Sequence, residues 1–226
     1  MRFSLRAGVV ASTALALGIG LAACGSANKT APSTSSVEAT NGSNTATSQA
    51  PPDKTIADYI KENNITETPV RHGDPGSPTI NLPLPPGWQD ASSGAPENAY
   101  GAMVYSDPAT AADPPTIIVF VAKLSGAVDG AKILEYAPTE IQKLPGYEGP
   151  HVGGPTKLGG FEATQIGGAY TKKGVKRAIG QMTSVIPGQD GLYVLQLNAD
   201  STGSQDQVQA LALATGAIAQ QAAITP

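Results

Sequence analysis

The chain has 226 residues with 14 basic and 18 acidic side chains, and only 14% of its residues are charged. Two of the basic residues lie in residues 1–23, so removal of that segment shifts the formal net charge from −4 to −6. An acidic chain is poorly suited to neutralising phosphates, which argues against a nucleic-acid partner. The 26 glycines and 19 prolines favour short strands and turns over long helices.

Residues 1–23 have the features of an export signal. Arg2 and Arg6 form a basic start, and residues 7–20 carry no charge. This apolar stretch is shorter than the ~20 residues that a membrane-spanning helix needs. The following Leu-Ala-Ala-Cys matches the bacterial lipobox, in which the cysteine thiol takes a diacylglyceryl group and the preceding bond is cut. We therefore predict a lipoprotein signal peptide over residues 1–23 and lipidation, with palmitate-type acyl chains, at Cys24.

Cys24 is the only cysteine, so no disulfide can form within the mature chain and its stability must come from an apolar core. Residues 24–52 are rich in Ser, Thr, Ala and Pro and contain no aromatic residue. Such a composition predicts a disordered tether with a coil dimension of roughly 30 Å, and it also suits O-glycosylation. Residues 53–226 have the length of a single domain.

The first half of this domain predicts one helix and three extended segments. Residues 55–64 have the apolar spacing of a short amphipathic helix. The prolines of residues 78–88 allow only an edge strand or an extended arm. A strand is expected over residues 99–107. The apolar run within residues 114–124 is typical of a central strand that is covered on both faces.

The second half predicts two helices around a four-stranded meander. A helix is expected over residues 129–143, where Pro138 should kink or restart it. Residues 156–200 alternate as four strands with glycine-containing turns. The last helix, residues 205–224, is predicted to start with a capping box of Ser204 and Gln207. Its expected inward face consists of Val208, Leu211, Thr215, Ile218 and Ala222.

This order predicts an α+β domain with an antiparallel sheet of about six to seven strands packed against helices. The segments TIADYIKENNITETPV and PLPPGW, the Pro-Pro before a hydrophobic strand and the alanine-rich last helix resemble the LpqN and LpqT family of mycobacterial lipoproteins. The resemblance covers the lipobox and nearly all of residues 54–224. It implies a PsbP-like α/β/α sandwich, lipid-anchored in the cell envelope, in a family associated with envelope biogenesis and lipid handling that generally lacks a defined enzymatic activity.

The residues that could carry catalysis are sparse. His72 and His151 lie in Gly/Pro-rich loops, and with no second cysteine they make no zinc-site spacing. His72 and Asp74 could pair as a base and its orienting acid, but no Gly-x-Ser-x-Gly elbow supplies a nucleophile. The glycine pairs do not match a phosphate-binding loop. We expect no enzymatic activity, no metal and no cofactor.

Three other features each allow two interpretations. The basic cluster (Lys172, Lys173, Lys176 and Arg177) marks a predicted hairpin tip that either leans toward anionic lipid headgroups or only keeps the hairpin soluble. Trp88 either stacks on a ligand at a pocket mouth or anchors the proline-rich arm in the core. The small residues of the last helix permit close packing on the sheet or leave room for a narrow apolar guest.

Together these features predict a non-enzymatic lipoprotein, anchored at the extracytoplasmic face of the cell membrane. It would bind an envelope lipid or glycolipid, or assist envelope lipid transport and biogenesis alongside envelope transport or biosynthesis proteins. The alternative is a protein–protein interaction module of the envelope without a small-molecule ligand. A hydrolase would require His72 or His151 beside a serine or carboxylate in a cleft.

Overall fold

The computed structural model describes residues 53–226. The predicted signal peptide (1–23), the tether (24–52) and the lipidation site Cys24 lie outside the described residues. Within residues 53–226, no helix is both long and apolar enough to cross a lipid bilayer.

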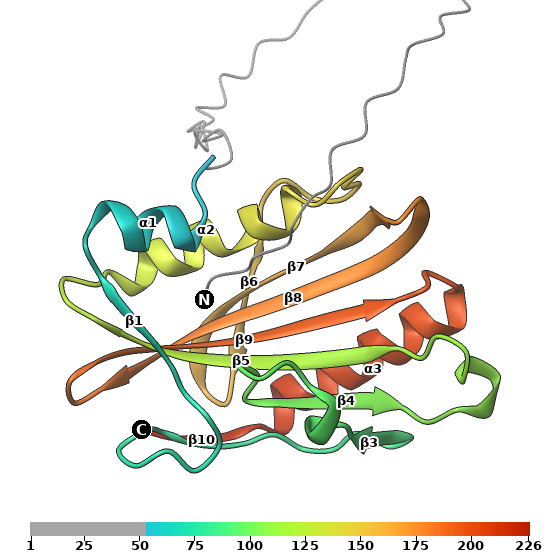
Figure 1. Cartoon of the computed structure of the whole chain (residues 1–226), viewed down its shortest axis with the longest axis horizontal. Helices are drawn as coiled ribbons and strands as arrows, with labels where there is room; N and C mark the ends of the chain where they lie inside the picture. The colour runs from blue at the N-terminus through green and yellow to red at the C-terminus, as the bar shows by residue number, and fades with distance from the viewer. Residues whose placement is uncertain (1–52) are drawn as a thin grey trace, which may run out of the picture. The chain divides into compact units, whose positions relative to one another are not determined.

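The described residues form three α-helices and ten strands (Figure 1). The helices are α1 (Ile56–Glu62), α2 (Gly130–Gln142) and α3 (Gln205–Gln221). The strands are β1 (Thr66–Pro69), β2 (Thr79–Asn81), β3 (Trp88–Asp90), β4 (Gly101–Tyr105), β5 (Thr116–Ser125), β6 (Gly154–Leu158), β7 (Phe161–Lys172), β8 (Val175–Gly188), β9 (Gly191–Ser201) and β10 (Ala223–Thr225).

One eight-stranded antiparallel sheet dominates the domain, which confirms the predicted α+β class. Its order is β3-β4-β5-β9-β8-β7-β6, and β1 pairs with the part of β5 that β4 leaves free. β6 to β9 are the predicted meander. The sheet exceeds the expected six to seven strands because the short segments β1 and β3 also pair at its edge.

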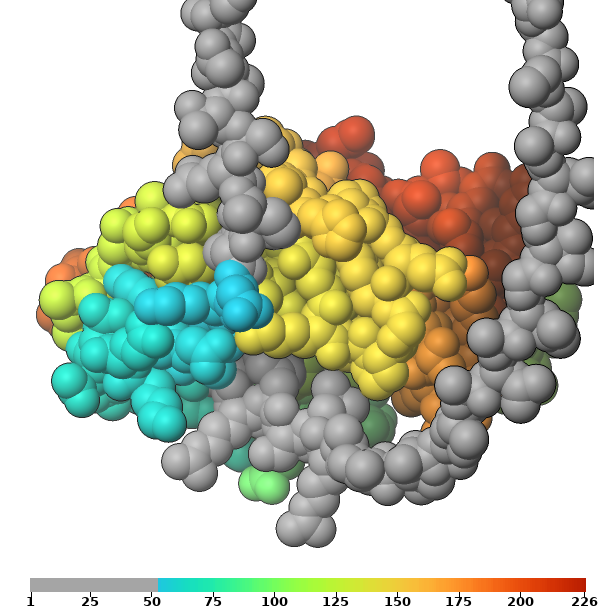
Figure 2. Space-filling view, turned by 90° about the horizontal axis from the view of Figure 1, so that it is seen from above, coloured from blue at the N-terminus to red at the C-terminus, as the bar shows by residue number. Residues whose placement is uncertain are grey.

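Helices cover both faces of the sheet. Side chains of β5 alternate between these faces, as a strand requires: Val119 and Val121 join the core under α3, and Leu124 joins the core under α1 and α2. α1 (cyan) and α3 (red) accordingly lie at opposite sides of the domain in Figure 2. The predicted central strand is confirmed.

The predicted first helix is confirmed and is held on α2. Thr55 caps α1, because its hydroxyl accepts a hydrogen bond from Asp58 N while the Asp58 carboxylate accepts one from Thr55 N. The Tyr59 hydroxyl accepts a hydrogen bond of 2.9 Å from Asp129 N at the start of α2. α2 then runs through Pro138 to Gln142, so the prediction that Pro138 restarts the helix is wrong.

Two details of the predicted last helix are wrong. Ser204 precedes α3 without a side-chain capping bond, because Gln207 accepts hydrogen bonds from the Thr202 amide and hydroxyl and donates to the backbone oxygen of Asp113. The helix also ends at Gln221, and β10 follows as a partner of β2. Its buried face consists of Gln207, Leu211, Ala214 and Ile218, and Val208 is 40% exposed.

Candidate functional site: an apolar trough beside the last helix

The floor of the candidate site is a patch of very small residues on the sheet face that α3 covers. Gly167 and Ala169 of β7 pair with Gly180 and Ala178 of β8, and Gly180 pairs in turn with Ala199 of β9. None of these residues has a side chain beyond Cβ. The sheet is therefore recessed here compared with its neighbouring core positions.

The helix does not fill this recess. α3 packs against β9 and β6, which lie on either side of β8 and β7 in the sheet order. A Cβ added at Gly180 would meet only the Ala199 side chain, at 3.8 Å, and one added at Gly167 would meet only the Ile179 carbonyl oxygen, at 3.4 Å. Open space therefore lies above both glycines.

Three adjoining hollows of about 580, 380 and 590 Å³ make one trough along α3. Thr215 lines all three, Gly167 and Gly180 line the first two, and Gln165 and Met182 line the last two. Each volume falls within the roughly 300–1,000 Å³ of small-molecule sites. The α3 wall consists of Val208, Leu211, Ala212, Thr215 and Ala219.

Most of the trough lining is apolar, with Gln165 and Thr215 as polar residues between its two ends. Lys176 and Thr202 lie at the end near the start of α3, and Lys157 and Gln220 lie at the far end. Val152, which is 65% exposed, forms part of the outer edge. This arrangement can hold an extended apolar chain lengthwise and place a polar group at either end.

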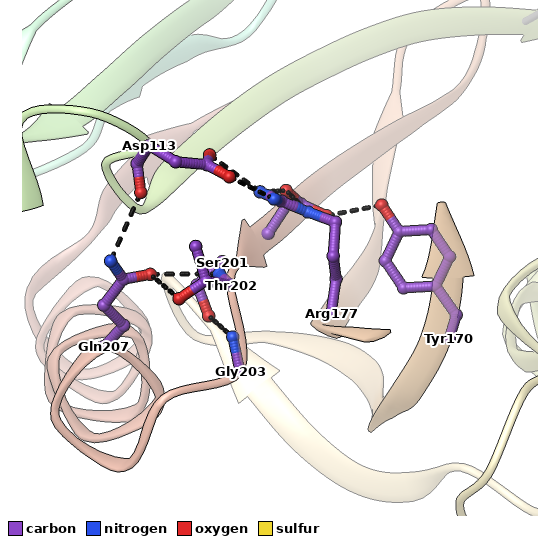
Figure 3. Close-up of polar contacts among 8 residues, drawn as sticks. Asp113, Tyr170, Arg177, Ser201, Thr202, Gly203 and Gln207 are labelled. Carbon is purple, nitrogen blue, oxygen red and sulfur yellow. Dashed lines mark hydrogen bonds and ion pairs between the residues drawn. The ribbon is translucent and has the colours of Figure 1, made fainter. Parts of the chain in front are cut away.

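Arg177, which lines the first hollow, belongs to an ion-pair cluster near the start of α3 (Figure 3). Arg177 donates two hydrogen bonds to Asp113, of 2.5 and 3.1 Å, and two more to Asp200, whose carboxylate also accepts one of 2.5 Å from the Tyr170 hydroxyl. Gln207 adds the bond to the Asp113 backbone and so ties the start of α3 to the same cluster.

The cluster changes how its members titrate. Hydrogen bonding to Arg177 lowers the pKa of Asp113, and the same bonds raise the pKa of Arg177. Burial, followed by the bond to Asp200, raises the pKa of Tyr170. Asp113 and Arg177 are therefore charged, and Tyr170 neutral, near neutral pH.

The basic cluster predicted at the hairpin tip is only partly a free surface. The tip lies between β7 and β8, as expected, but Arg177 is 10% exposed and turned into the ion-pair cluster. Lys176 lies 2.6 Å from Glu148. Lys172 and Lys173 are exposed at the tip. Two of the four charges of this cluster are therefore paired with acidic side chains. Only Lys172 and Lys173 remain for the interpretation as a membrane-facing patch.

The structure decides between the two interpretations of Trp88. Its side chain is buried in the main core and its ring lies 5.6 Å from that of Tyr105. The interpretation as a core anchor of the proline-rich arm is therefore confirmed.

The two histidines lie apart from the trough lining. The His72 ring lies 5.4 Å from that of Tyr100, and the Asp74 carboxylate accepts a bond from the Arg71 amide instead. The backbone oxygen of His151 accepts a bond from Gln142. Within residues 53–226, neither imidazole bonds to a serine or carboxylate, and no three side chains of the metal-ligating types cluster together.

Sequence reasoning found one wall of the trough but missed its floor. The small residues of the last helix were recognised, whereas Gly167 and Gly180 were treated as ordinary strand positions. The available signal was the even spacing of Gly and Ala in two consecutive strands, which places them on one face.

The antiparallel sheet with helices on both faces defines an α/β/α sandwich, and an open trough runs along its last helix. The family model described as "Probable lipoprotein LpqN" matches residues 52–225. This chain belongs to the LpqN lipoprotein family, as its sequence motifs indicated.

A relative in Mycobacterium tuberculosis (strain ATCC 25618 / H37Rv), "Lipoprotein LpqN", is 50% identical over 179 residues, which cover 78% of this chain and 76% of the relative. A solved structure, described as the "Crystal structure of LpqN involved in cell envelope biogenesis of Mycobacterium tuberculosis", matches with a TM-score of 0.71 and 50% identity. That match covers 77% of this chain and 99% of the other.

Proposed function

We propose that this chain is a non-enzymatic, lipid-anchored accessory protein that supports envelope biogenesis by holding an acyl chain of an envelope lipid or glycolipid in the trough beside α3. Membership of a lipoprotein family supports the anchoring, and the involvement of the solved relative in cell envelope biogenesis supports the link to that process.

The shape and chemistry of the trough support an acyl chain as its ligand. Its floor contains a patch of Gly and Ala, its helical wall is largely apolar, and its lysine side chains lie at the ends. A slender chain of methylene groups fits such a surface. Each buried CH₂ contributes about 0.8 kcal/mol, so part of one acyl chain is enough for measurable binding.

The predicted anchor and tether give this binding a mechanical context. A domain held to the membrane at Cys24 by residues 24–52 stays within a few nanometres of the bilayer. Its lipid ligand is then present at a high effective concentration. Modest intrinsic affinity therefore suffices for exchange with the membrane.

The test is native mass spectrometry of the lipoprotein in detergent, after incubation with envelope lipid extract. Gly180→Leu would fill the trough with one side chain, since the space above Gly180 is open. Gly94→Leu is the matched control, because a Cβ at Gly94 meets no atom within 4 Å and the residue lies in a short 3₁₀ helix outside the trough. Lipid adducts should persist in the control and disappear in Gly180→Leu. Adducts that survive in a folded Gly180→Leu protein would contradict this use of the trough.

A second candidate function is docking of an envelope protein on the outer side of α3. Leu213 is 67% exposed and lines none of the three hollows of the trough. The substitution Leu213→Asp should then abolish partner capture and leave lipid adducts unchanged. Partner capture that is lost in Gly180→Leu but kept in Leu213→Asp would favour the lipid function alone.

A further inference from the structure

The tip of the β7–β8 hairpin is an exposed surface with three lysines and one apolar side chain. Residues 172–176 are Lys-Lys-Gly-Val-Lys, and all five are exposed. A two-residue turn at Lys173 and Gly174 joins the strands with the positive φ angles that such a turn requires, so Lys172 and Val175 lie opposite each other. In Figure 1 this hairpin tip lies at the upper right, where the orange strands β7 and β8 meet.

The hairpin differs in charge from the rest of the chain. The whole chain has 18 acidic and 14 basic side chains, yet residues 163–189 contain four basic side chains and no acidic one. The four are Lys172, Lys173, Lys176 and Arg177. An excess of positive charge on one hairpin of an acidic protein favours a negatively charged partner at that place.

Acidic side chains from neighbouring elements contact only the two basic residues nearest the body of the sheet. Arg177 is held in the ion-pair cluster and is nearly buried. Glu148 lies 2.6 Å from Lys176, but both side chains of this pair are about two-thirds exposed. An exposed pair of this kind contributes little free energy and exchanges readily for another anion.

Lys172 and Lys173 are the charges left for a partner. No ion pair in the described part of the chain includes either of them. Asp113 lies within electrostatic reach of Lys172, but its carboxylate is bound by Arg177. Val175 beside them is 57% exposed. Lysines around an exposed apolar side chain suit an anionic bilayer, because the charges meet the headgroups while the apolar group enters the interface.

The first hollow of the trough begins directly behind the hairpin tip. Lys176 and Arg177 line this hollow, and they follow Val175 in the chain. Ala178 and Gly180 of β8 continue its lining toward the middle of the sheet. A bilayer in contact with the hairpin tip would therefore lie next to this end of the trough.

We propose that the hairpin tip docks on an anionic lipid bilayer and brings this end of the trough to the membrane surface. The inference rests on the proposed function for the lipid that would pass between bilayer and trough, whereas the docking itself needs no bound lipid. The predicted tether keeps the domain near the membrane, so weak docking is enough to orient it.

A tryptophan placed at the hairpin tip tests the docking. The lipoprotein with Val175→Trp is reconstituted in vesicles of phosphatidylcholine with brominated acyl chains, which quench the fluorescence of an indole that enters the bilayer. The wild type supplies the background of Trp88, which is buried in the core. Quenching should increase at least twofold when phosphatidylglycerol is added to the vesicles. It should decrease again in about 1 M salt, where the screening length is about 3 Å.

Leu213→Trp is the matched control, because Leu213 is exposed on α3 and lies outside the trough lining. Its quenching should not depend on phosphatidylglycerol. No increase in Val175→Trp, or an equal increase in Leu213→Trp, overturns the proposal.

Lysine substitutions in the Val175→Trp protein test the charge. Lys172→Gln/Lys173→Gln should remove at least half of the quenching that depends on phosphatidylglycerol. Lys61→Gln/Lys157→Gln removes two exposed lysines elsewhere and should leave it unchanged. Equal effects of the two pairs would show that net charge alone is responsible, and would overturn the proposal.

The docking and the proposed function fail separately. Lipid adducts in detergent report the trough, and Lys172 and Lys173 line none of its three hollows. Adducts should therefore persist in Lys172→Gln/Lys173→Gln, and their loss would assign these lysines to the ligand and overturn the docking. Flotation with pure phosphatidylcholine vesicles reports the anchor. If the protein does not float, the same vesicles are added to it in solution, and the same quenching outcomes decide.

Discussion

Arg177 on β8 forms two hydrogen bonds, of 2.5 and 3.1 Å, with Asp113, which lies 64 residues earlier in the loop between β4 and β5. The same guanidinium binds Asp200 at the end of β9, and the Asp113 backbone holds Gln207 of α3. One arginine thereby connects an outer loop, two central strands and the start of the helix that forms the trough wall.

Arg177→Leu should lower the free energy of unfolding by about 2–4 kcal/mol. Loss of one partner of a buried ion pair typically costs about 3–5 kcal/mol, and the half-exposed Asp113 reduces that figure here. Urea unfolding followed by circular dichroism measures the change. Lys176→Gln is the control, because its exposed pair with Glu148 should contribute no more than about 1 kcal/mol. Equal effects of the two substitutions would show that the cluster does not hold the loop.

The same ion pair should make stability sensitive to acid. Arg177 lowers the pKa of Asp113 in the folded state below its ordinary value of 3.8, so the folded state binds this proton less readily than the unfolded state does. The stabilisation is therefore complete above about pH 5 and is lost as the pH falls below about 4. The difference in unfolding free energy between the wild type and Arg177→Leu should shrink between pH 6 and pH 3. A constant difference over that range would contradict the assignment.

Substitution by alanine should affect stability differently at two glycines whose added Cβ atoms would lie on opposite faces of the sheet. Gly180→Ala should change stability by less than about 1 kcal/mol, because its new Cβ finds only an ordinary contact in the trough. Gly168→Ala should cost about 1–3 kcal/mol, because its Cβ would lie 2.6 Å from the Glu148 carbonyl oxygen and 2.7 Å from the Tyr147 ring. Thermal unfolding of both variants measures this. A severe loss in Gly180→Ala would show that the trough is filled.

The residues that precede α1 and α3 should also differ in what they contribute. Thr55→Ala should cost about 1 kcal/mol, because the Thr55 hydroxyl accepts the Asp58 amide at 3.1 Å. Ser204→Ala should change the unfolding free energy by less than about 0.5 kcal/mol, since that side chain makes no capping bond. Chemical denaturation of the two variants checks both values. A larger loss in Ser204→Ala would mean that the predicted capping box forms after all.

Much of the fold could be predicted because its signals are local. The turn at Lys173 and Gly174 needs two positive φ angles, and the chain places a glycine at one of them, with observed values of 52° and 79°. The long apolar stretch of β5 likewise predicted a central strand. The short strands β1, β3 and β10 were missed, since their few residues acquire strand geometry only through their partners.

The sequence by itself determined the antiparallel meander and the family, and it predicts export and lipidation at Cys24, because each of these signals is encoded by neighbouring residues. The tertiary structure alone decided the trough and the role of Arg177. Those features depend on strand register and helix placement, which bring together Gly167 with Gly180 and Asp113 with Arg177. Such contacts join residues that have no common pattern along the chain, so only the packed molecule reveals them.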